Sequence, residues 1–216
     1  MKKLLSVLML LCFVATSTLH AQDAKAKSII DKVSANLKKA KAISANFSLS
    51  VIDGHGKKQM TKTGTFQMKG DKYKVALKGG QEIICDGKSV WTYMSQNKEV
   101  QVSAYSPESQ AISPSTLFSG SYEKEYTYSY AGTKKIAGKS VAVISLKPKK
   151  KNTGFSKVDL YINTGTNMIA GGHVYGTAGT SYAYSISNVK TTSDISSSVF
   201  TFNTKAHPGV DVIDLR

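Results

Sequence analysis

The sequence predicts an α+β protein in which about ten or eleven antiparallel strands curl around one apolar face. Three observations support this prediction. Apolar and polar residues alternate in one short segment after another from position 45 onwards, turns rich in Gly, Asn and Asp separate these segments, and positions 23–40 repeat instead with helical spacing. A sheet of this many strands does not stay flat and open, so we expect it to curl.

The first residues have the pattern of an export signal. Two lysines precede an apolar run at positions 4–14, which is too short to span a membrane, and small polar residues lead to Ala21. Lipidation at Cys12 is a weaker alternative, because a large leucine stands where that processing needs a small residue. We therefore expect a signal peptide at 1–21, and we expect 22–216 to form a single domain.

The composition narrows the choice of partners. The chain has 29 Lys and Arg against 14 Asp and Glu, and Arg216 is its single arginine. Base-edge readout and bidentate phosphate contacts rely on arginine, so no nucleic acid is expected as a partner. A lysine-rich surface fits weak attraction to anionic lipid headgroups or acidic proteins, and it fits solubility alone equally well. Cys85 is the one cysteine after the signal, so a hydrophobic core rather than a disulfide must hold the domain.

One amphipathic helix is expected after the signal. Asp23 is its expected N-cap. Apolar residues follow at steps of four and three, namely Ala26, Ile30, Val33, Leu37 and Ala40. Because this stripe contains no Trp or Phe, packing on the sheet is favoured over binding to a membrane surface.

The first strands form a meander. Apolar residues alternate over 45–51, then in a second strand that contains Phe66 and Met68, and then in a third strand over 73–77. Within 81–103, Asp86-Gly87 predicts a two-residue type I′ turn that pairs Cys85 with Lys88. The residues that then share the other face of this hairpin are Glu82, Ile84, Trp91 and Tyr93, with Glu82 beside Trp91.

Positions 106–122 break the alternation. Pro107 and Pro114 exclude a central strand, and Leu117 and Phe118 are apolar residues in a polar segment. The segment is either a set of short helices that form a lid over the sheet or an ordinary connection with a hydrophobic anchor. Alternation then returns, and the remaining strands are expected at 126–130, 141–146, 158–162, 168–175, 180–189 and 200–202.

The sequence lacks the patterns of catalytic and metal chemistry. His55, His173 and His207 lie in or near turns without metal-ligand spacing. Phosphate-binding glycine loops, paired catalytic carboxylates and nucleophile motifs are absent from the sequence, so we expect no enzyme, no catalytic residue, no metal and no cofactor. Cys85 is expected to be a small buried strand residue rather than a nucleophile. A curled sheet of this kind encloses either a solid core or a cavity for an apolar ligand, and periodicity does not distinguish them.

Five segments, taken in order, resemble a known family. They are NFSLSVIDGHG from Asn46, GTFQMKGDKYKV from Gly64, EII from Glu82, DGKSVWTY from Asp86 and VFTFNTKAHPGVDVIDL from Val199. Together they resemble the periplasmic outer-membrane lipoprotein carrier (LolA) family over nearly the whole mature chain. The resemblance implies an unclosed, strongly curved antiparallel β-barrel with short lid helices, which correspond to the segment near 107–122, over a hydrophobic cavity.

The resemblance also implies a function. The chain would be a periplasmic monomer that collects acylated lipoproteins from an inner-membrane ATP-driven release complex, shields their acyl chains from water, and delivers them to an outer-membrane acceptor. The runner-up is a carrier of other lipids, or a sensor of envelope stress, on the same fold. Such relatives usually add a second domain or a membrane anchor. A structural envelope protein with a solid core is the third interpretation.

The resemblance places the acyl chains against apolar strand and lid residues. The lipid-binding candidates are Phe47, Leu49, Val51, Phe66, Met68, Tyr73, Val75, Ile84, Trp91, Tyr93, Leu117 and Phe118. In the family an arginine just after the second strand holds the lid shut, where this chain has Lys69 or Gly70. A lysine offers one flexible point charge instead of a planar fork, so the closed state is either weaker here or fastened differently.

Overall fold

The structure is a computed structural model that describes residues 17–106, 122–151, 153–192 and 194–216, and the side chains from residue 24 onwards. These residues contain two α-helices, α2 (Ser17–Lys39) and α4 (Tyr122–Glu125), and two 3-10 helices, η2 (Ser197–Phe200) and η3 (Thr204–Ala206). The strands of the described residues are β1 (Ala42–Ile52), β2 (Lys58–Lys69), β3 (Lys72–Leu77), β4 (Gln81–Cys85), β5 (Ser89–Met94), β6 (Glu99–Ala104), β7 (Tyr126–Ile136), β8 (Lys139–Pro148), β9 (Phe155–Asn163), β10 (Met168–Gly176), β11 (Ser181–Thr192) and β12 (Asp211–Asp214).

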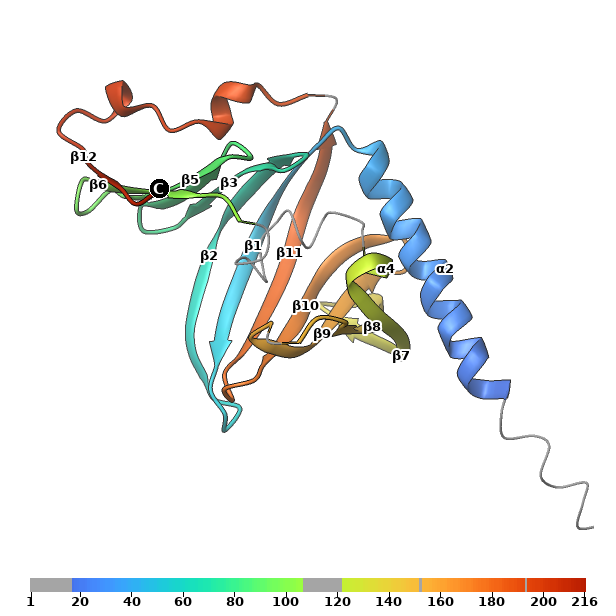
Figure 1. Cartoon of the computed structure of the whole chain (residues 1–216). Coiled ribbons are helices and arrows are strands. Elements are labelled where there is room, and N and C mark those ends of the chain that lie inside the picture. Colours follow the sequence, from blue (N-terminus) through green and yellow to red (C-terminus); the bar gives the residue numbers. More distant parts are fainter. Residues whose placement is uncertain (1–16, 107–121, 152, 193) are drawn as a thin grey trace, which may run out of the picture.

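All twelve described strands belong to one sheet, in the order β12-β6-β5-β4-β3-β2-β1-β11-β10-β9-β8-β7. Figure 1 shows that the sheet curls strongly and that α2 and α4 lie on its inner, concave side. The edge strands β12 and β7 do not pair with each other, so the barrel is unclosed. This confirms the predicted architecture, with slightly more strands than expected.

Helix α2 packs on the sheet by the stripe that the sequence predicts. The buried residues of the helix are Ala26, Ile30, Val33 and Leu37. They join one core with β8, β9 and β10, which contribute Ile144, Leu160, Ile162 and Ile169 among others. This half of the concave side is therefore filled with the protein's own side chains, as a packed interior requires.

The start of α2 differs from the prediction. The helix begins at Ser17 and runs through Asp23, which is therefore not its N-cap. Once a packed turn exists, adding further residues to a helix costs little, so the helix extends beyond the stripe that anchors it. Among the described residues, no helix has the length and apolarity needed to cross a membrane.

The hairpin at Asp86 has a longer turn than expected. The Asp86 carboxylate accepts hydrogen bonds from the backbone N–H groups of Lys88 and Ser89, at 2.8 Å each, and these bonds organise a four-residue connection. Cys85 therefore pairs with Val90 instead of Lys88, and Glu82 lies opposite Tyr93 rather than Trp91. A shift of two residues keeps every side chain on its own face, so the predicted faces are correct although the predicted partners are wrong.

The C-terminal segment also corrects a prediction. The expected strand at 200–202 is not a strand, because Ser197–Phe200 form a 3-10 helix whose cap, Ser196, accepts a hydrogen bond from the backbone of Ser198. Phe200 and Phe202 are both buried, and this gives the false appearance of strand alternation. The last strand is β12, which pairs with β6 in parallel and so departs from the otherwise antiparallel sheet.

Candidate ligand-binding face

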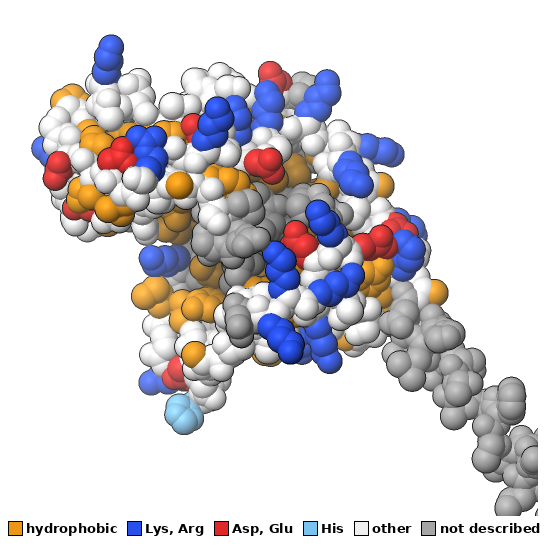
Figure 2. Space-filling model, in the orientation of Figure 1, with side chains coloured by type: hydrophobic (Ala, Val, Ile, Leu, Met, Phe, Trp, Pro, Cys, Tyr) orange, Lys and Arg blue, Asp and Glu red, His pale blue; other side chains and the backbone are white. Residues whose placement is uncertain are grey.

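The concave side continues beyond the strands that α2 covers, and there its apolar residues are only partly covered at some positions. This part is formed by β11, β1, β2 and β3, and several of its apolar residues remain only partly buried against the core. These are Phe47 and Leu49 of β1, Val75 of β3, and Tyr182 and Ile186 of β11. In Figure 2 hydrophobic side chains gather beside the β1–β2 hairpin at the lower left, with lysines around them. Partly covered apolar side chains on a curved sheet make a surface that suits an apolar ligand.

Strand register lines these side chains up. Phe47 lies opposite Gly64 on β2 and Ile186 on β11, whereas Leu49 lies between Lys62 and Tyr184. A Cβ atom at Gly64 would lie 3.0 Å from Cε1 of Phe47 and 2.1 Å from the carbonyl oxygen of Ala76. A larger residue there would clash with the Ala76 backbone and press on the Phe47 ring, so a glycine is needed where β2 pairs with β3 beside this ring.

Two buried tyrosines belong to the core of the concave side. Tyr184 is 8% exposed and Tyr122 is 2% exposed. Burial raises the pKa of both hydroxyl groups well above the ordinary value of 10, so both are neutral at any physiological pH. The Tyr184 hydroxyl is buried without a hydrogen-bond partner among the described residues. Both tyrosines therefore bring no charge into the core, although each still carries a polar hydroxyl group.

The structure places seven of the predicted lining residues on the concave side. Phe66, Met68 and Tyr73 are buried in the main core, and Phe47, Leu49 and Val75 pack at its margin. Val51 belongs to the same side by strand alternation, opposite Met60 and Tyr182. Whether any of them contacts a ligand stays a prediction. Leu117 and Phe118, together with the predicted lid, lie outside the described residues.

Three predicted lining residues lie on the opposite, convex face. Ile84 and Val100 form a small cluster with Phe202 of the C-terminal segment, and Trp91 and Tyr93 pack against it. The Tyr93 ring lies 5.2 Å from that of Phe202 and 4.5 Å from that of His207. Figure 1 shows the C-terminal segment (red) running along the outside of β3–β6. Ile84, Trp91 and Tyr93 therefore hold this segment in place and do not line the concave side.

The alternation of side chains along β4 explains why Ile84 faces outward. Cys85, the neighbour of Ile84 along β4, is fully buried in the main core, so Ile84 must point to the other side. Alternation groups residues by face, but it does not state which face is inward when both are covered. The inward residues of this hairpin that the prediction missed are Ile83, Val90 and Met94. On β11, the alternating apolar residues Tyr182, Tyr184 and Ile186 would have revealed the other missed part of the face.

The residue at the expected latch position faces the wrong way for a latch. Lys69 follows the concave residue Met68, so it points to the convex side, where it forms an ion pair with Asp194 and donates a hydrogen bond of 3.4 Å to the Ile195 carbonyl. The lysine pairing lowers the pKa of the Asp194 carboxyl. This contact ties β2 to the segment that leads into η2.

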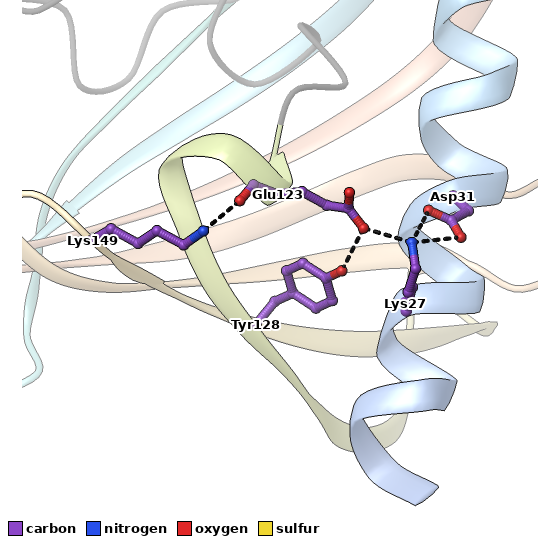
Figure 3. Close-up of polar contacts among 5 residues, drawn as sticks. All are labelled: Lys27, Asp31, Glu123, Tyr128 and Lys149. Carbon is purple, nitrogen blue, oxygen red and sulfur yellow. Dashed lines mark hydrogen bonds and ion pairs between the residues drawn. The ribbon is translucent and has the colours of Figure 1, made fainter. Parts of the chain in front are cut away.

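A different polar contact joins the two helices of the concave side. Lys27 of α2 lies 2.6 Å from the Glu123 carboxylate of α4 and 3.2 Å from Asp31 (Figure 3). The Tyr128 hydroxyl donates to the same Glu123 oxygen at 2.8 Å, and Lys149 donates to the Glu123 carbonyl at 2.7 Å. The Lys27 and Tyr128 hydrogen bonds hold the pKa of Glu123 below its ordinary value. These groups are exposed, so the network orients α4 more than it stabilises the fold.

Titratable groups elsewhere in the described part of the chain show no arrangement for catalysis. Burial raises the pKa of the Cys85 thiol, which favours the unreactive protonated form. The buried Asp159 carboxylate accepts from Ser145 at 2.5 Å, Tyr175 at 2.9 Å and Lys157 at 3.1 Å, so its hydrogen bonds are satisfied within the sheet. The described residues contain no group of three or more His, Cys, Asp or Glu that could hold a metal ion. What the arrangement offers is apolar surface.

Comparisons with known proteins agree with this geometry. The profile of the family described as "Outer membrane lipoprotein carrier protein LolA" matches residues 38–203. A protein of Pseudomonas paraeruginosa named outer-membrane lipoprotein carrier protein is 28% identical over 207 residues, which is 93% of this chain and 93% of that protein. One of the same name from Pseudomonas fluorescens is 29% identical over 76% of this chain and 77% of its own length.

Solved structures share the fold at low sequence identity. An uncharacterized conserved protein from Thermus thermophilus superimposes with a TM-score of 0.58 at 12% identity, over 88% of this chain and 99% of that one. The Mycobacterium tuberculosis lipoprotein LppX gives a TM-score of 0.50 at 12% identity, over 81% of this chain and 100% of its own. At these identities the likeness concerns the fold alone.

Proposed function

Because the chain belongs to the outer membrane lipoprotein carrier protein (LolA) family, we propose that it binds the acyl chains of lipoproteins and carries them through the periplasm without catalysing a reaction. The observation that carries this proposal is the row of partly buried apolar residues on the concave side of β11, β1, β2 and β3, beside a half that α2 already fills. A carrier needs such a division, because one half keeps the fold stable and the other is available to cargo.

The energetics fit reversible carriage. Each methylene group that leaves water contributes about 0.8 kcal/mol, so burying about ten of them contributes roughly 8 kcal/mol before the cost of association. A net free energy of that size would correspond to a dissociation constant of about 1 μM, and the cost of association makes the affinity for about ten methylene groups weaker than this, so longer or multiple chains are needed for tight binding. Release then requires a partner that offers similar apolar burial. An inner-membrane ATP-driven release complex as donor and an outer-membrane acceptor complete the proposed route.

The export signal belongs to the same proposal. Cleavage after Ala21 would remove Ser17–Ala21 from the start of α2 and leave in the mature chain all the residues of the helix that are described as buried, which begin at Ala26. The packing of α2 on the sheet is therefore compatible with processing. Residues 22–216 would form the single carrier domain, which acts as a monomer.

Detergent-free purification from an envelope extract, followed by native mass spectrometry, tests the proposal. An acylated protein bound to the chain supports lipoprotein carriage, and its loss in a variant with a charge on the concave side identifies the binding face. A lipid without attached protein favours the runner-up, a carrier of other lipids on the same fold. A spectrum of unliganded protein alone, after extraction from envelopes rich in lipoproteins, would support the third interpretation, a structural protein.

A further inference from the structure

A shallow pocket of about 310 Å³ lies at one end of the concave side. Its apolar wall consists of Leu77 and Met94, and Lys62 and Gln81 lie beside them. On β3, Leu77 continues the inward row of Tyr73 and Val75, which belong to the main core. By the same alternation Gln81 and Met94 are the last inward-facing residues of β4 and β5, and Lys62 is the first inward-facing residue of β2 beyond its pairing with β3. The pocket is therefore the end of the candidate ligand-binding face.

Two turns hold the pocket in shape. Gly80 has φ of +87°, and a Cβ atom there would lie 2.0 Å from the Ser95 hydroxyl, so only glycine allows this contact. The Ser95 N–H donates a 3.0 Å hydrogen bond to the Gly80 carbonyl, which joins the β3–β4 turn to the β5–β6 turn. The site is thus built from the backbone of two pinned turns and not from mobile side chains alone.

The charge of the pocket is positive and uncompensated. Lys62 and Lys78 line it, and none of the described residues that line it is acidic. Neither ammonium group forms an ion pair with another described residue, whereas Glu82 is engaged with Lys74 at 2.9 Å on the other face of the sheet. Two unpaired cations beside a low-dielectric wall attract an anion more strongly than isolated surface lysines do. Neutral donors such as Gln81 and Asn97 can add hydrogen bonds to the same anion.

We infer that this pocket holds the anionic group of an amphipathic ligand whose hydrocarbon chains lie on the concave side. The anionic group is a phosphate or a carboxylate, because either can accept hydrogen bonds from both lysines. The pocket is at the small end of the range for ligand sites, so it suits a headgroup and not the chains themselves. This inference rests on the proposed function and adds to it a preference for acylated ligands that carry negative charge close to their chains.

Paired ligands test the inference on the full mature chain. Displacement of the neutral dye N-phenylnaphthylamine is measured with oleoyl lysophosphatidic acid against monooleoylglycerol, and with a diacylated lipopeptide that carries Asp against one that carries Asn. We expect at least one anionic ligand to bind about tenfold more tightly than its neutral partner at low salt, as one charge-assisted hydrogen bond would give. The preference should shrink as salt increases. Which of the two pairs shows it identifies phosphate or carboxylate as the source.

The Lys62→Gln, Lys78→Gln double variant should lose that preference and keep its affinity for the neutral ligands. Lys190→Gln, Lys205→Gln is the matched control, since these lysines are also exposed and the net charge changes equally. Circular dichroism confirms that both variants are folded. Equal binding of charged and neutral ligands by the wild type, or the same loss in the control, overturns the inference and leaves the proposed function standing. Failure of the wild type to bind any acylated ligand overturns both.

Discussion

A charge placed in the middle of the concave side should abolish acyl binding in a pH-dependent way. Leu49 is partly buried between Tyr184 and Lys62 on neighbouring strands, and the change is Leu49→Glu. The fold should tolerate it, because the introduced carboxylate can pair with Lys62 directly across the strands. A hydrocarbon chain laid over that position, however, would have to bury a charge, which is favourable only after the carboxyl group is protonated.

The ordinary pKa of a glutamate determines how much affinity the variant should lose. Protonating a carboxyl group whose ordinary pKa is about 4.3 costs roughly 3.7 kcal/mol at pH 7, and the pairing with Lys62 adds to this cost, so binding should weaken by about 500-fold or more. The loss should diminish tenfold for each pH unit that the solution is acidified, until the pH approaches about 4.3. Wild-type binding of a neutral acyl ligand should lack this slope. Fluorescence displacement of N-phenylnaphthylamine by monooleoylglycerol between pH 5 and pH 8 measures it.

The control variant introduces the charge on the same strand but on the opposite face of the sheet. Asn46→Glu introduces the same carboxylate on β1 at an exposed position that points away from the concave side. It should leave the affinity for monooleoylglycerol unchanged within about twofold at every pH, since no hydrocarbon covers it. If Leu49→Glu binds as tightly as the wild type, or if both variants lose affinity alike, the ligand does not lie on this face and the reasoning is wrong.

Three further predictions concern the fold. Ile30→Ala should destabilise the domain by about 2–5 kcal/mol in urea unfolding, because Ile30 is 1% exposed between α2 and the sheet and its loss leaves a cavity; a loss below about 1 kcal/mol would show that the helix is not firmly packed. Phe200→Ala, at a fully buried position, should cost about 3–5 kcal/mol without lowering acyl affinity at temperatures where the variant is folded; reduced affinity there would place the convex face in the site. The contact with Lys27 lowers the pKa of Glu123, so the α2–α4 contact should persist at pH values above the ordinary pKa near 4.5 and weaken as the pH falls through the lowered pKa. Hydrogen exchange of the α4 amides, corrected for intrinsic exchange, should follow this titration in the wild type. In Glu123→Gln the corrected exchange should be independent of pH.

Local pattern was enough to predict most of the fold. The spacing from Ala26 to Leu37 predicts the buried face of α2, and alternation in β1 predicts that Phe47, Leu49 and Val51 share a side. The unclosed barrel followed from the number of strands together with the family resemblance. In each of these elements one face is clearly more apolar than the other, so the spacing of apolar residues alone predicts which side chains are buried.

Two kinds of feature escaped this reasoning. One is tertiary: Trp91 and Tyr93 are apolar because the C-terminal segment covers them from outside, and no pattern within β5 reveals such a distant cover. The other is side-chain chemistry at a turn: the Asp86 carboxylate binds two backbone N–H groups and lengthens the turn, which the Asp-Gly pair alone does not disclose. The wrong prediction of a strand at 200–202 has the same tertiary cause, because the burial of Phe200 against another segment imitates the alternation of a strand.

The parallel pairing of Asp211–Asp214 with Glu99–Val102 covers the edge of β6 with a segment that lies more than a hundred residues later in the sequence. Until residues 211–214 have paired, β6 carries an open row of backbone donors and acceptors, which can recruit a strand from another molecule. Pairing across so long a stretch of sequence is also slow to form. A chain truncated before position 211 would keep the backbone groups of β6 exposed permanently. We expect such a chain to aggregate through this edge while its concave side stays intact.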